Sequence, residues 1–253
     1  MGSAERVDGS EGTQKVATFL GAAGHRHKPL MLDGAARTAQ QAADALGVFV
    51  GQIAKSIIFQ RRPDNQAVLV ITAGDQRVDE RKVQALVCVD GQTLGRADAA
   101  FVKSNTGFSI GGVPPVAHAV PSVTLVDQSL SRFPVIWAAA GHPHAVFEMS
   151  FDELVKLADA PASDVVVDPA ADRQALQRAI DLVTARAKTL DASSEVPSPC
   201  ISVCRMSAAT GWCEGCFRSS PEIAAWSQAH DSSKREVWAL IGQRMQTLQA
   251  TLV

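Results

Sequence analysis

Four cysteines crowded near the C-terminus constrain the fold of this chain more than any other feature. They follow the spacing Cys200-x3-Cys204-x8-Cys213-x2-Cys216, so four thiols lie within 17 residues. Thiols at this spacing can close around one ion, and such a site organises a small module of its own. The stretch 191–199, rich in Ser, Pro and acidic residues, precedes them and is typical of a linker. The sequence therefore predicts a large N-terminal domain joined to a small C-terminal module.

Length and composition bound the class of protein. The chain has 253 residues, of which 46% are hydrophobic, and no apolar run approaches the ~20 residues that cross a bilayer. Residues 1–12 are polar and glycine-rich, unlike a secretory signal, and we expect them to form a disordered arm. We therefore expect a cytoplasmic protein without a membrane partner. Because the net charge is only −2, a nucleic-acid partner would have to meet a local basic patch, and we expect no DNA partner.

A metal site explains the cysteine cluster better than disulfides do, because the cytoplasm keeps thiols reduced. We expect Cys200, Cys204, Cys213 and Cys216 to bind tetrahedral zinc. An iron–sulfur cluster uses the same ligands and remains an open alternative. A Cys-x2-Cys redox pair is the weaker alternative, because nothing around it resembles a thioredoxin. The fifth cysteine, Cys88, lies in an apolar run, where a buried inert thiol is expected.

Residues 13–169 mix strand and helix patterns without regular alternation, which predicts a compact α+β (mixed α/β) domain with helices around a mixed β-sheet. Capping boxes at Thr38–Gln41 and Ser150–Glu153 mark two helix starts. Apolar periodicity, glycine and proline set the other boundaries. The expected helices cover 14–23, 38–46, 78–87, 98–102 and 150–157, and the expected strands cover 53–59, 67–72, 123–126, 135–139, 145–147 and 165–167.

The rest of the chain contains three expected helices. Residues 170–198 are predicted to form an amphipathic helix over 172–190, followed by the linker. Residues 199–253 form the cysteine module with two helices. Ser220 caps the first of these ahead of a proline, and Ser233 and Glu236 have the spacing of a capping box in the second.

The stretch Thr106–His118 carries three glycines and two prolines between apolar residues. Glycine permits positive φ and lets a ligand approach the main chain, while proline fixes the exit of the loop. From composition alone, an ordinary turn between strands is the simpler explanation. The surrounding motifs decide whether it is a substrate-binding loop.

Lys55 lies in an apolar strand pattern, on the same face as Ile53 and Ile57. A lysine in this position either reaches water from a sheet edge or carries a positive charge into a pocket. The local residues leave both interpretations open.

Four segments in series resemble the YbaK/ProX (EbsC-like) family of aminoacyl-tRNA editing domains. Members of that family are freestanding relatives of the editing insertion of bacterial prolyl-tRNA synthetase, and they hydrolyse the ester of tRNA charged with the wrong amino acid. The resemblance therefore implies a YbaK-like fold and a trans-editing deacylase. It runs from about Ala17 to Val167, and its segments are Lys55–Phe59, Val70–Val83, Thr106–Pro115 and Trp137–Gly141.

The resemblance also implies the site. Lys55 takes the position of the essential lysine, near the terminal adenosine of the tRNA. Gly111 and Pro115 are the ends of a Gly-x-x-x-Pro motif whose backbone amides contact the aminoacyl carbonyl. Hydrolysis in similar enzymes is substrate-assisted, which fits a sequence without an evident Ser-His-Asp or Cys-His arrangement. The implied substrate-binding residues are Ser56, Gly112, Gly141 and His142.

The implied substrate is tRNA(Pro) carrying Cys, Ala or another small amino acid. A synthetase needs such editing because a methylene difference is worth only ~1–3 kcal/mol in binding. Prolyl-tRNA synthetase is a candidate partner. Two alternatives from other classes stay open: a non-catalytic adaptor that binds tRNA or a synthetase, and a redox or metal sensor.

One departure from the family leaves the amino acid open. This chain has Gly141-His-Pro-His144, whereas Cys-tRNA(Pro) deacylases of the family continue after the glycine with Lys-Arg-Gly. His142 and His144 could line the pocket or bind tRNA, and as a metal pair they would need a third ligand. Scattered charges usually form a solvated face, but a tRNA-facing patch could be built from Arg61, Arg62, Arg77, Arg81, Lys82 and Lys103.

The C-terminal module resembles a small bacterial domain, the domain of unknown function 1289, over about Pro197–Arg244. The resemblance rests on the cysteines and on Trp226 and Trp238, and it implies no activity. Because the module is too small for a sizeable core, we expect it to fold around its metal and two helices that carry tryptophan. We expect it to help the docking of tRNA or of a protein.

Overall fold

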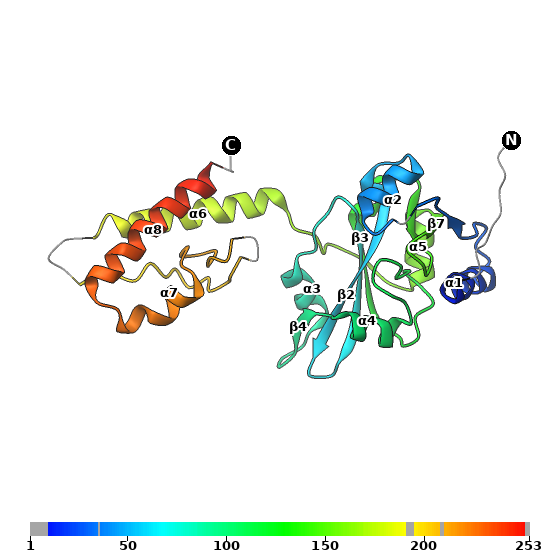
Figure 1. The fold of residues 1–253 in the computed structure, drawn as a ribbon, viewed down its shortest axis with the longest axis horizontal. Helices are drawn as coiled ribbons and strands as arrows, with labels where there is room; N and C mark the ends of the chain where they lie inside the picture. The colour runs from blue at the N-terminus through cyan, green and yellow to red at the C-terminus, as the bar shows by residue number, and fades with distance from the viewer. Residues whose placement is uncertain (1–9, 35, 191–194, 208–209, 251–253) are drawn as a thin grey trace. The chain divides into compact units, whose positions relative to one another are not determined.

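The computed structural model describes residues 10–34, 36–190, 195–207 and 210–250 and divides the chain into two compact units, Met1–Val167 and Asp168–Val253 (Figure 1). Most of the arm predicted over 1–12, and the start of the linker predicted over 191–199, lie outside the described residues. In the part of the chain that is described, no helix is long and apolar enough to span a membrane.

The first unit is built on one mixed sheet, as the sequence predicts, and the described part of this sheet has eight strands where six are expected. The strand order is β1-β7-β6-β2-β3-β5-β8, and β4 also pairs with β2. Antiparallel hairpin pairing joins β2 to β3, whereas β2 with β6, β3 with β5 and β5 with β8 run parallel. The strands are β1 (Leu30–Met31), β2 (Ile53–Arg62), β3 (Gln66–Ala73), β4 (Thr93–Arg96), β5 (Val123–Asp127), β6 (Ile136–Ala139), β7 (Ala145–Met149) and β8 (Ala162–Ser163).

Helices cover both faces of this sheet, as Figure 1 shows. The helices of the unit are α1 (Glu11–Ala22), α2 (Ala39–Leu46), α3 (Glu80–Val87), α4 (Ala99–Thr106) and α5 (Phe151–Ala158), with short 3-10 turns η1 (Val50–Gln52) and η2 (Gln128–Arg132). Side chains from α1, α4 and α5 pack on the face that carries Ile58 and Ile71. Val83 of α3 packs on the opposite face against Phe59 and Val70. Successive residues of β2 therefore belong to different apolar cores, as the two-residue period of a strand requires.

The predicted helix starts rest on capping residues that the structure confirms. Thr38 accepts a hydrogen bond from the backbone N–H of Gln41, whose side chain returns a bond to the cap, and Ser150 and Glu153 repeat the arrangement. Gly47 ends α2 in the left-handed conformation, with a φ of 67°. These local signals satisfy helix-end N–H and C=O groups that have no partner inside the helix.

Several elements and boundaries differ from the prediction, and the two-residue strand β1 is not predicted. The first helix begins at Glu11 instead of residue 14, because Ser10 caps it. The strand predicted over 165–167 is wrong: β8 ends the sheet at Ala162–Ser163, and Val166 forms only an isolated bridge with Val78. The short strand β4 is not predicted at all, because its sequence Thr-Leu-Gly-Arg has one large apolar residue and a glycine.

The second unit has a core of its own. Its helices are α6 (Pro169–Ala187), α7 (Ser220–Ala225) and α8 (Asp231–Gln249), with the 3-10 turn η3 (Trp226–Gln228). Ile180 and Val183 of α6 pack with Trp238 and Ile241 of α8 and with Phe217. Helix α6 was expected to belong with the linker, but in the structure it supplies one side of the core of the second unit.

In the last two helices, the capping residue is not the one that was predicted. The capping box of α7 joins Ser219, not Ser220, to Glu222, and the Ser219 N–H donates to Glu222 Oε2 at 2.7 Å. Helix α8 begins at Asp231 after His230, so the capping box predicted at Ser233 is wrong. Ser219 and Ser220 stand next to each other at the start of α7, and only one of them can occupy the cap, whereas in α8 the cap is His230 and Ser233 lies within the first turn.

We expect the ion pair between Glu222 and Arg244 to make the second unit sensitive to acid. Arg244 donates to both oxygens of Glu222, at 2.7 and 2.9 Å, and to the Phe217 carbonyl at 2.8 Å. The hydrogen bonds from Arg244 lower the pKa of Glu222. A carboxyl with a lowered pKa stabilises the fold above the ordinary Glu pKa of about 4.3, and this stabilisation is lost as the pH falls through the folded-state value.

Replacing Arg244 by Met should therefore lower the free energy of unfolding at pH 7 by about 2 kcal/mol. It should also flatten the loss of stability on acidification. Urea unfolding of both proteins at pH 7 and pH 4 measures the effect, with the exposed Arg178→Met on α6 as control. Equal pH dependence of wild type and Arg244→Met would show that the pair does not contribute.

Candidate functional site

The middle of β2 has one unpaired edge. Along its other edge, β2 pairs with β3 from Ala54 to Arg61. On the open side, β6 pairs only with residues 53 and 54, and β4 pairs only with residues 59 to 62. No described strand therefore pairs with residues 55–58 on this side, and the sheet has a gap there.

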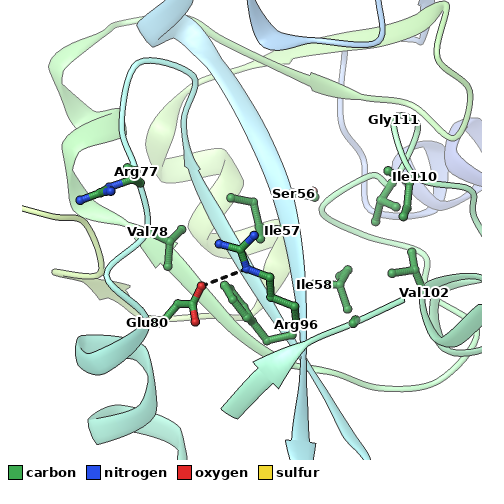
Figure 2. Close-up of a pocket in the computed structure, with 13 residues that line it drawn as sticks. Ser56, Ile57, Ile58, Arg77, Val78, Glu80, Arg96, Val102, Ile110 and Gly111 are labelled. Carbon is green, nitrogen blue, oxygen red and sulfur yellow. Dashed lines mark hydrogen bonds and ion pairs between the residues drawn. The ribbon is translucent and has the colours of Figure 1, made fainter. Parts of the chain in front are cut away.

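A pocket of about 430 Å³ occupies this gap. Figure 2 shows Ile57 and Ile58 projecting to opposite sides of β2, so the pocket wraps around the open edge of the strand. On one side its wall comes from the residues before and within α3, among them Arg77 and Val78. On the other side the wall comes from Val102 of α4 and from the loop that follows it.

Ser56 lies in this pocket with its hydroxyl unsatisfied. Its Oγ is buried and has no hydrogen-bond partner among the described residues. A buried hydroxyl without a partner costs about 1–3 kcal/mol, so most such groups in proteins are paired. A ligand in the pocket would supply the missing partner. The structure thus places the predicted binding residue Ser56 where a polar group of a ligand can reach it.

Lys55 points to the other face of β2 and binds backbone carbonyls. Its Nζ donates to Gln76 O at 2.6 Å and to Gly74 O at 3.1 Å, so it ties β2 to the turn that follows β3. Burial lowers the pKa of Lys55, and the carboxylates of Asp75 and Asp127 oppose this shift. An ammonium has three N–H donors. One donor is thus left beyond the two carbonyls.

The glycine loop after α4 forms the opposite wall of the pocket. Gly107 ends α4 with a φ of 80°, and Gly111 lies in the pocket with a φ of 92°. Both values lie in the left-handed region that favours glycine. A Cβ on Gly112 would lie 3.0 Å from the backbone of His142, so the loop is pressed against the segment after β6. The structure therefore brings Ser56, Gly111, Gly112 and His142 to one region, with Lys55 beside it.

Pro115 lies elsewhere, in a second hollow of about 590 Å³. Lys15 of α1 and His118 line this hollow too. Burial lowers the pKa of His118, whose Nε2 lies 2.8 Å from the Pro114 carbonyl. The two ends of the Gly-x-x-x-Pro motif, Gly111 and Pro115, thus face two different cavities.

Gly141 is covered by α1. It has a φ of 87°, and a Cβ on it would lie 2.4 Å from the carbonyl oxygen of Gly12. A Cβ on Gly12 would in turn lie 2.4 Å from the Gly141 oxygen. The two glycines therefore allow helix α1 to touch the segment after β6. This packing role explains Gly141 without direct contact to a substrate.

His142 and His144 lie side by side. Their ring centroids are 5.2 Å apart, and the His144 N–H donates to Nδ1 of His142 at 3.2 Å. Among the described residues, no group of three or more His, Cys, Asp or Glu side chains is arranged to hold a metal ion. The third ligand that a metal pair would need is therefore not in place here.

The cysteines of the second unit form two neighbouring pairs. A hydrogen bond with Cys200 raises the pKa of the Cys204 thiol. Burial opposes ionisation of Cys213, but backbone N–H groups outweigh it and lower the pKa of this thiol. Arg218 Nε donates to the Cys216 sulfur at 3.4 Å. The four thiols thus lie as two pairs, and in the described part of the chain no three of them are arranged to hold one metal ion.

Some residues that line the pocket were not predicted from the sequence. Arg96 ends the unpredicted strand β4 and pairs with Glu80 at 3.3 Å, and both side chains line the pocket. Ile110 also lines it, although 62% of this residue is exposed. A large apolar side chain among the glycines of this loop is a sequence signal for this part of the pocket.

A pocket of this size between an open strand edge and a glycine loop is typical of a small-ligand site. Comparison with known families makes this specific: residues 33–157 match the aminoacyl-tRNA editing domain, and residues 198–245 match a protein family of unknown function, DUF1289. The chain belongs to the aminoacyl-tRNA editing family and carries a C-terminal DUF1289 domain. Both resemblances predicted from the sequence are thereby confirmed.

Three relatives illustrate the match. The uncharacterized protein YwhH of Bacillus subtilis (strain 168) is 33% identical over 117 residues, which cover 46% of this chain and 72% of YwhH. The proline–tRNA ligase of Lactobacillus helveticus (strain DPC 4571) is 31% identical over 111 residues, which are 44% of this chain but 19% of the ligase. A crystal structure described as a candidate trans-editing enzyme for prolyl-tRNA synthetase is 36% identical, with a TM-score of 0.59, and the match covers 64% of this chain and all of that one.

Proposed function

We propose that this protein is a trans-editing hydrolase that deacylates mischarged aminoacyl-tRNA, with tRNA(Pro) carrying Cys, Ala or another small amino acid as its substrate. The observation that carries the proposal is the pocket lined by Ser56 and by the loop that contains Gly111. The Ser56 hydroxyl has no hydrogen-bond partner among the described residues, and Ser56 lies next to Lys55 on β2. The likeness to part of a proline–tRNA ligase and to a candidate trans-editing enzyme supports the choice of tRNA(Pro). The substrate places the protein in the cytoplasm, with prolyl-tRNA synthetase as a candidate partner.

Hydrolysis of an aminoacyl ester requires few catalytic groups from the protein. The ester between an amino acid and the terminal ribose is activated, so it needs orientation, a donor for the developing oxyanion and a water. We assign the backbone around Gly111 and the Lys55 ammonium to the carbonyl side of the ester. A hydroxyl of the ribose or a group of the amino acid then assists the water, and no protein nucleophile is required. His142, whose backbone contacts Gly112, is assigned to the wall that limits the size of the amino acid.

A panel of charged tRNAs tests the function. The full chain is incubated with tRNA(Pro) charged with cysteine, alanine, serine or proline, and release of the amino acid is followed. We expect one or more of the three small non-cognate esters to be hydrolysed well above the buffer rate, and prolyl-tRNA to be spared. If every ester decays at the buffer rate, the protein is not a deacylase. Retained tRNA binding in a gel-shift assay would then favour the adaptor role.

We propose further that the four cysteines of the second unit bind one zinc ion or, as the alternative, one iron–sulfur cluster. The donor set supports this, because Cys200 lies with Cys204 and Cys213 with Cys216, and backbone N–H groups favour the Cys213 thiolate. Such ions select thiolate ligands, and their binding couples to folding in small modules. The metal would stabilise the module and take no part in ester hydrolysis.

Metal content gives the corresponding prediction. Purified full-length protein should contain about one zinc, or iron with visible absorption, per chain, and Cys213→Ser should lose the metal and melt at a lower temperature. Cys88→Ser is the matched control, because Cys88 belongs to the first unit. A wild-type protein free of metal after anaerobic purification, with four titratable thiols in the second unit, would contradict the proposal.

A further inference from the structure

We propose that Asp127 is the buried counter-charge of Lys55 and thereby a positioning residue for ester hydrolysis. The pairing of the two charges rests on the structure, whereas its role in hydrolysis rests on the proposed function. Asp127 is the last residue of β5 and lines neither of the two hollows described above. Three observations carry the inference: the burial of this carboxylate, its position in the sheet next to Lys55, and the neutral character of its hydrogen-bond donors.

Asp127 is fully buried, with an exposed fraction of 0%. Its carboxylate accepts hydrogen bonds from the Thr72 hydroxyl at 3.1 Å, from the Ser129 N–H at 3.2 Å and from the Ser129 hydroxyl. All three donors are neutral. A buried carboxylate is costly unless it is both hydrogen-bonded and balanced by a positive charge. The surroundings of Asp127 therefore favour a cation close by.

The sheet places Lys55 close to this carboxylate. Lys55 of β2 lies directly opposite Thr72 of β3, and side chains that are directly opposite on antiparallel strands share one face of the sheet. Ile71 and Val126, which precede Thr72 and Asp127, are partners in β3 and β5. Because the Thr72 hydroxyl donates to Asp127, the carboxylate lies on the face of the sheet to which Lys55 points.

Two carboxylates face Lys55. Burial lowers the pKa of Lys55, and the charges of Asp75 and of Asp127 both raise it. Asp75 lies in the turn after β3, its side chain is 33% exposed, and it pairs with Arg132 at 2.8 Å. The negative charge of Asp75 is therefore shared with a guanidinium and screened by water. Asp127 is shielded from water, so its charge acts on Lys55 through the low-dielectric interior.

The protonation of Lys55 decides whether it has a donor for the substrate. The carbonyls of Gly74 and Gln76 accept two hydrogen bonds from Nζ. An ammonium has three N–H groups, whereas a neutral amine has two, and both of these would be used by the carbonyls. By favouring the charged form, Asp127 preserves the third donor and the positive charge that the proposed function assigns to the ester.

Titration of Lys55 by NMR tests the pairing without any tRNA. The ¹³Cε and ¹⁵Nζ resonances of the labelled full chain are followed from pH 6 to pH 11, and the Lys55 signals are those that Lys55→Met lacks. Asp127→Asn removes the charge but keeps a side-chain oxygen that can cap η2. We expect the Lys55 titration midpoint to move to lower pH, because one of the two charges that oppose burial is gone. An unchanged or higher midpoint would overturn the inference.

Asp98→Asn is the matched control for the NMR titration. Asp98 also caps a helix, accepting the Phe101 N–H at 2.7 Å, and it is not one of the two carboxylates that act on Lys55. This variant should leave the Lys55 midpoint where it is in the wild type. An equal shift in both variants would show that loss of a cap, and not of a counter-charge, moves the midpoint.

The pH dependence of deacylation gives a second readout. kcat/KM of Asp127→Asn for the best ester of the tRNA panel is measured from pH 6 to pH 9 and corrected for the buffer rate. The loss relative to wild type should be small at pH 6 and severalfold at pH 9, because a lysine with a lowered pKa loses its proton sooner as the pH rises. Loss by the same factor at every pH would assign Asp127 a purely structural role.

A double-mutant cycle covers the case in which Asp127→Asn folds poorly. Each single variant, Asp127→Asn or Lys55→Met, leaves one buried group without its counter-charge, whereas the double variant leaves neither. The double variant should therefore lose less stability to urea than the sum of the two single losses, and it should fold even if Asp127→Asn alone does not. Additive losses, or a double variant that is no more stable than Asp127→Asn, would contradict the pairing.

The outcome is separable from that of the proposed function. If the wild type hydrolyses no charged tRNA but Asp127→Asn lowers the Lys55 midpoint, the pairing is supported and the deacylase is contradicted. If the wild type is a deacylase and Asp127→Asn has the same pH profile, the deacylase is supported and the positioning role of Asp127 is overturned.

Discussion

Replacement of Lys55 by Met is expected to lower kcat/KM for deacylation by about 10²-fold or more, the scale of removing one donor from a developing oxyanion. The Lys55 ammonium is half-buried beside the pocket, two of its donors are used by the carbonyls of Gly74 and Gln76, and its charge remains for the substrate. Methionine keeps the length and apolar stem of the side chain but removes the charge and all donors. Single-turnover deacylation of the best ester in the tRNA panel measures the loss.

The structural role of Lys55 has to be separated from a role in hydrolysis. Gln66→Met is the control, since Gln66 Nε2 also donates to a backbone carbonyl, that of Pro121 at 2.9 Å, and does not line the pocket. Lys55→Met leaves the carbonyls of Gly74 and Gln76 without this donor, and the control also removes a donor to a carbonyl, so both should lower the free energy of unfolding by about 1–3 kcal/mol per carbonyl. Only Lys55→Met should lose activity, and Lys55→Arg should restore part of it because a charged donor returns. Equal activity losses in the two Met variants would assign Lys55 a purely structural role.

The second large effect is expected in helix α1. Gly12→Ala should lower the free energy of unfolding by about 1–3 kcal/mol, because the new methyl group would lie 2.4 Å from the Gly141 carbonyl oxygen and force α1 away from it. Alanine favours a helix over glycine by about 1 kcal/mol, so a loss would run against the intrinsic propensity. Urea unfolding followed by circular dichroism measures the change.

Gly21→Ala provides the control within the same helix. A Cβ at position 21 meets no atom within 4 Å, so this variant should be as stable as wild type or more stable. If Gly12→Ala and Gly21→Ala unfold at the same denaturant concentration, the contact between α1 and the segment after β6 does not form in solution. Because Gly12 lies outside residues 33–157, the same comparison also measures how far the editing domain depends on a helix beyond the family match.

Local signals in the sequence predict much of the fold. The capping boxes at Thr38 and Ser150 and the two-residue period of β2 depend only on neighbours in the chain, and the structure confirms them. The same period places Lys55 on the face opposite Ser56. The series of motifs is specific enough to identify the editing family before any coordinates are known.

What the sequence did not reveal depends on contacts between distant segments. Strand β4 pairs with β2 at a register that its own four residues do not encode, and the gap over residues 55–58 exists only because β4 and β6 stop on either side of it. The contact of Gly12 with Gly141 spans most of the domain. Likewise, the spacing of a Gly-x-x-x-Pro pattern does not indicate which cavity each end lines, and in the structure Gly111 and Pro115 line different cavities.

The packing of α6 determines where the chain can be cut into two units that each keep their own core. The DUF1289 match covers residues 198–245, yet Ile180 and Val183 of α6 fill the core around Trp238. A cut in the linker at 191–199 would strip this helix from the module and leave a tryptophan-lined face open to water. The portion that can be exchanged between proteins as a self-contained block therefore begins at Asp168, thirty residues before the family match begins at residue 198.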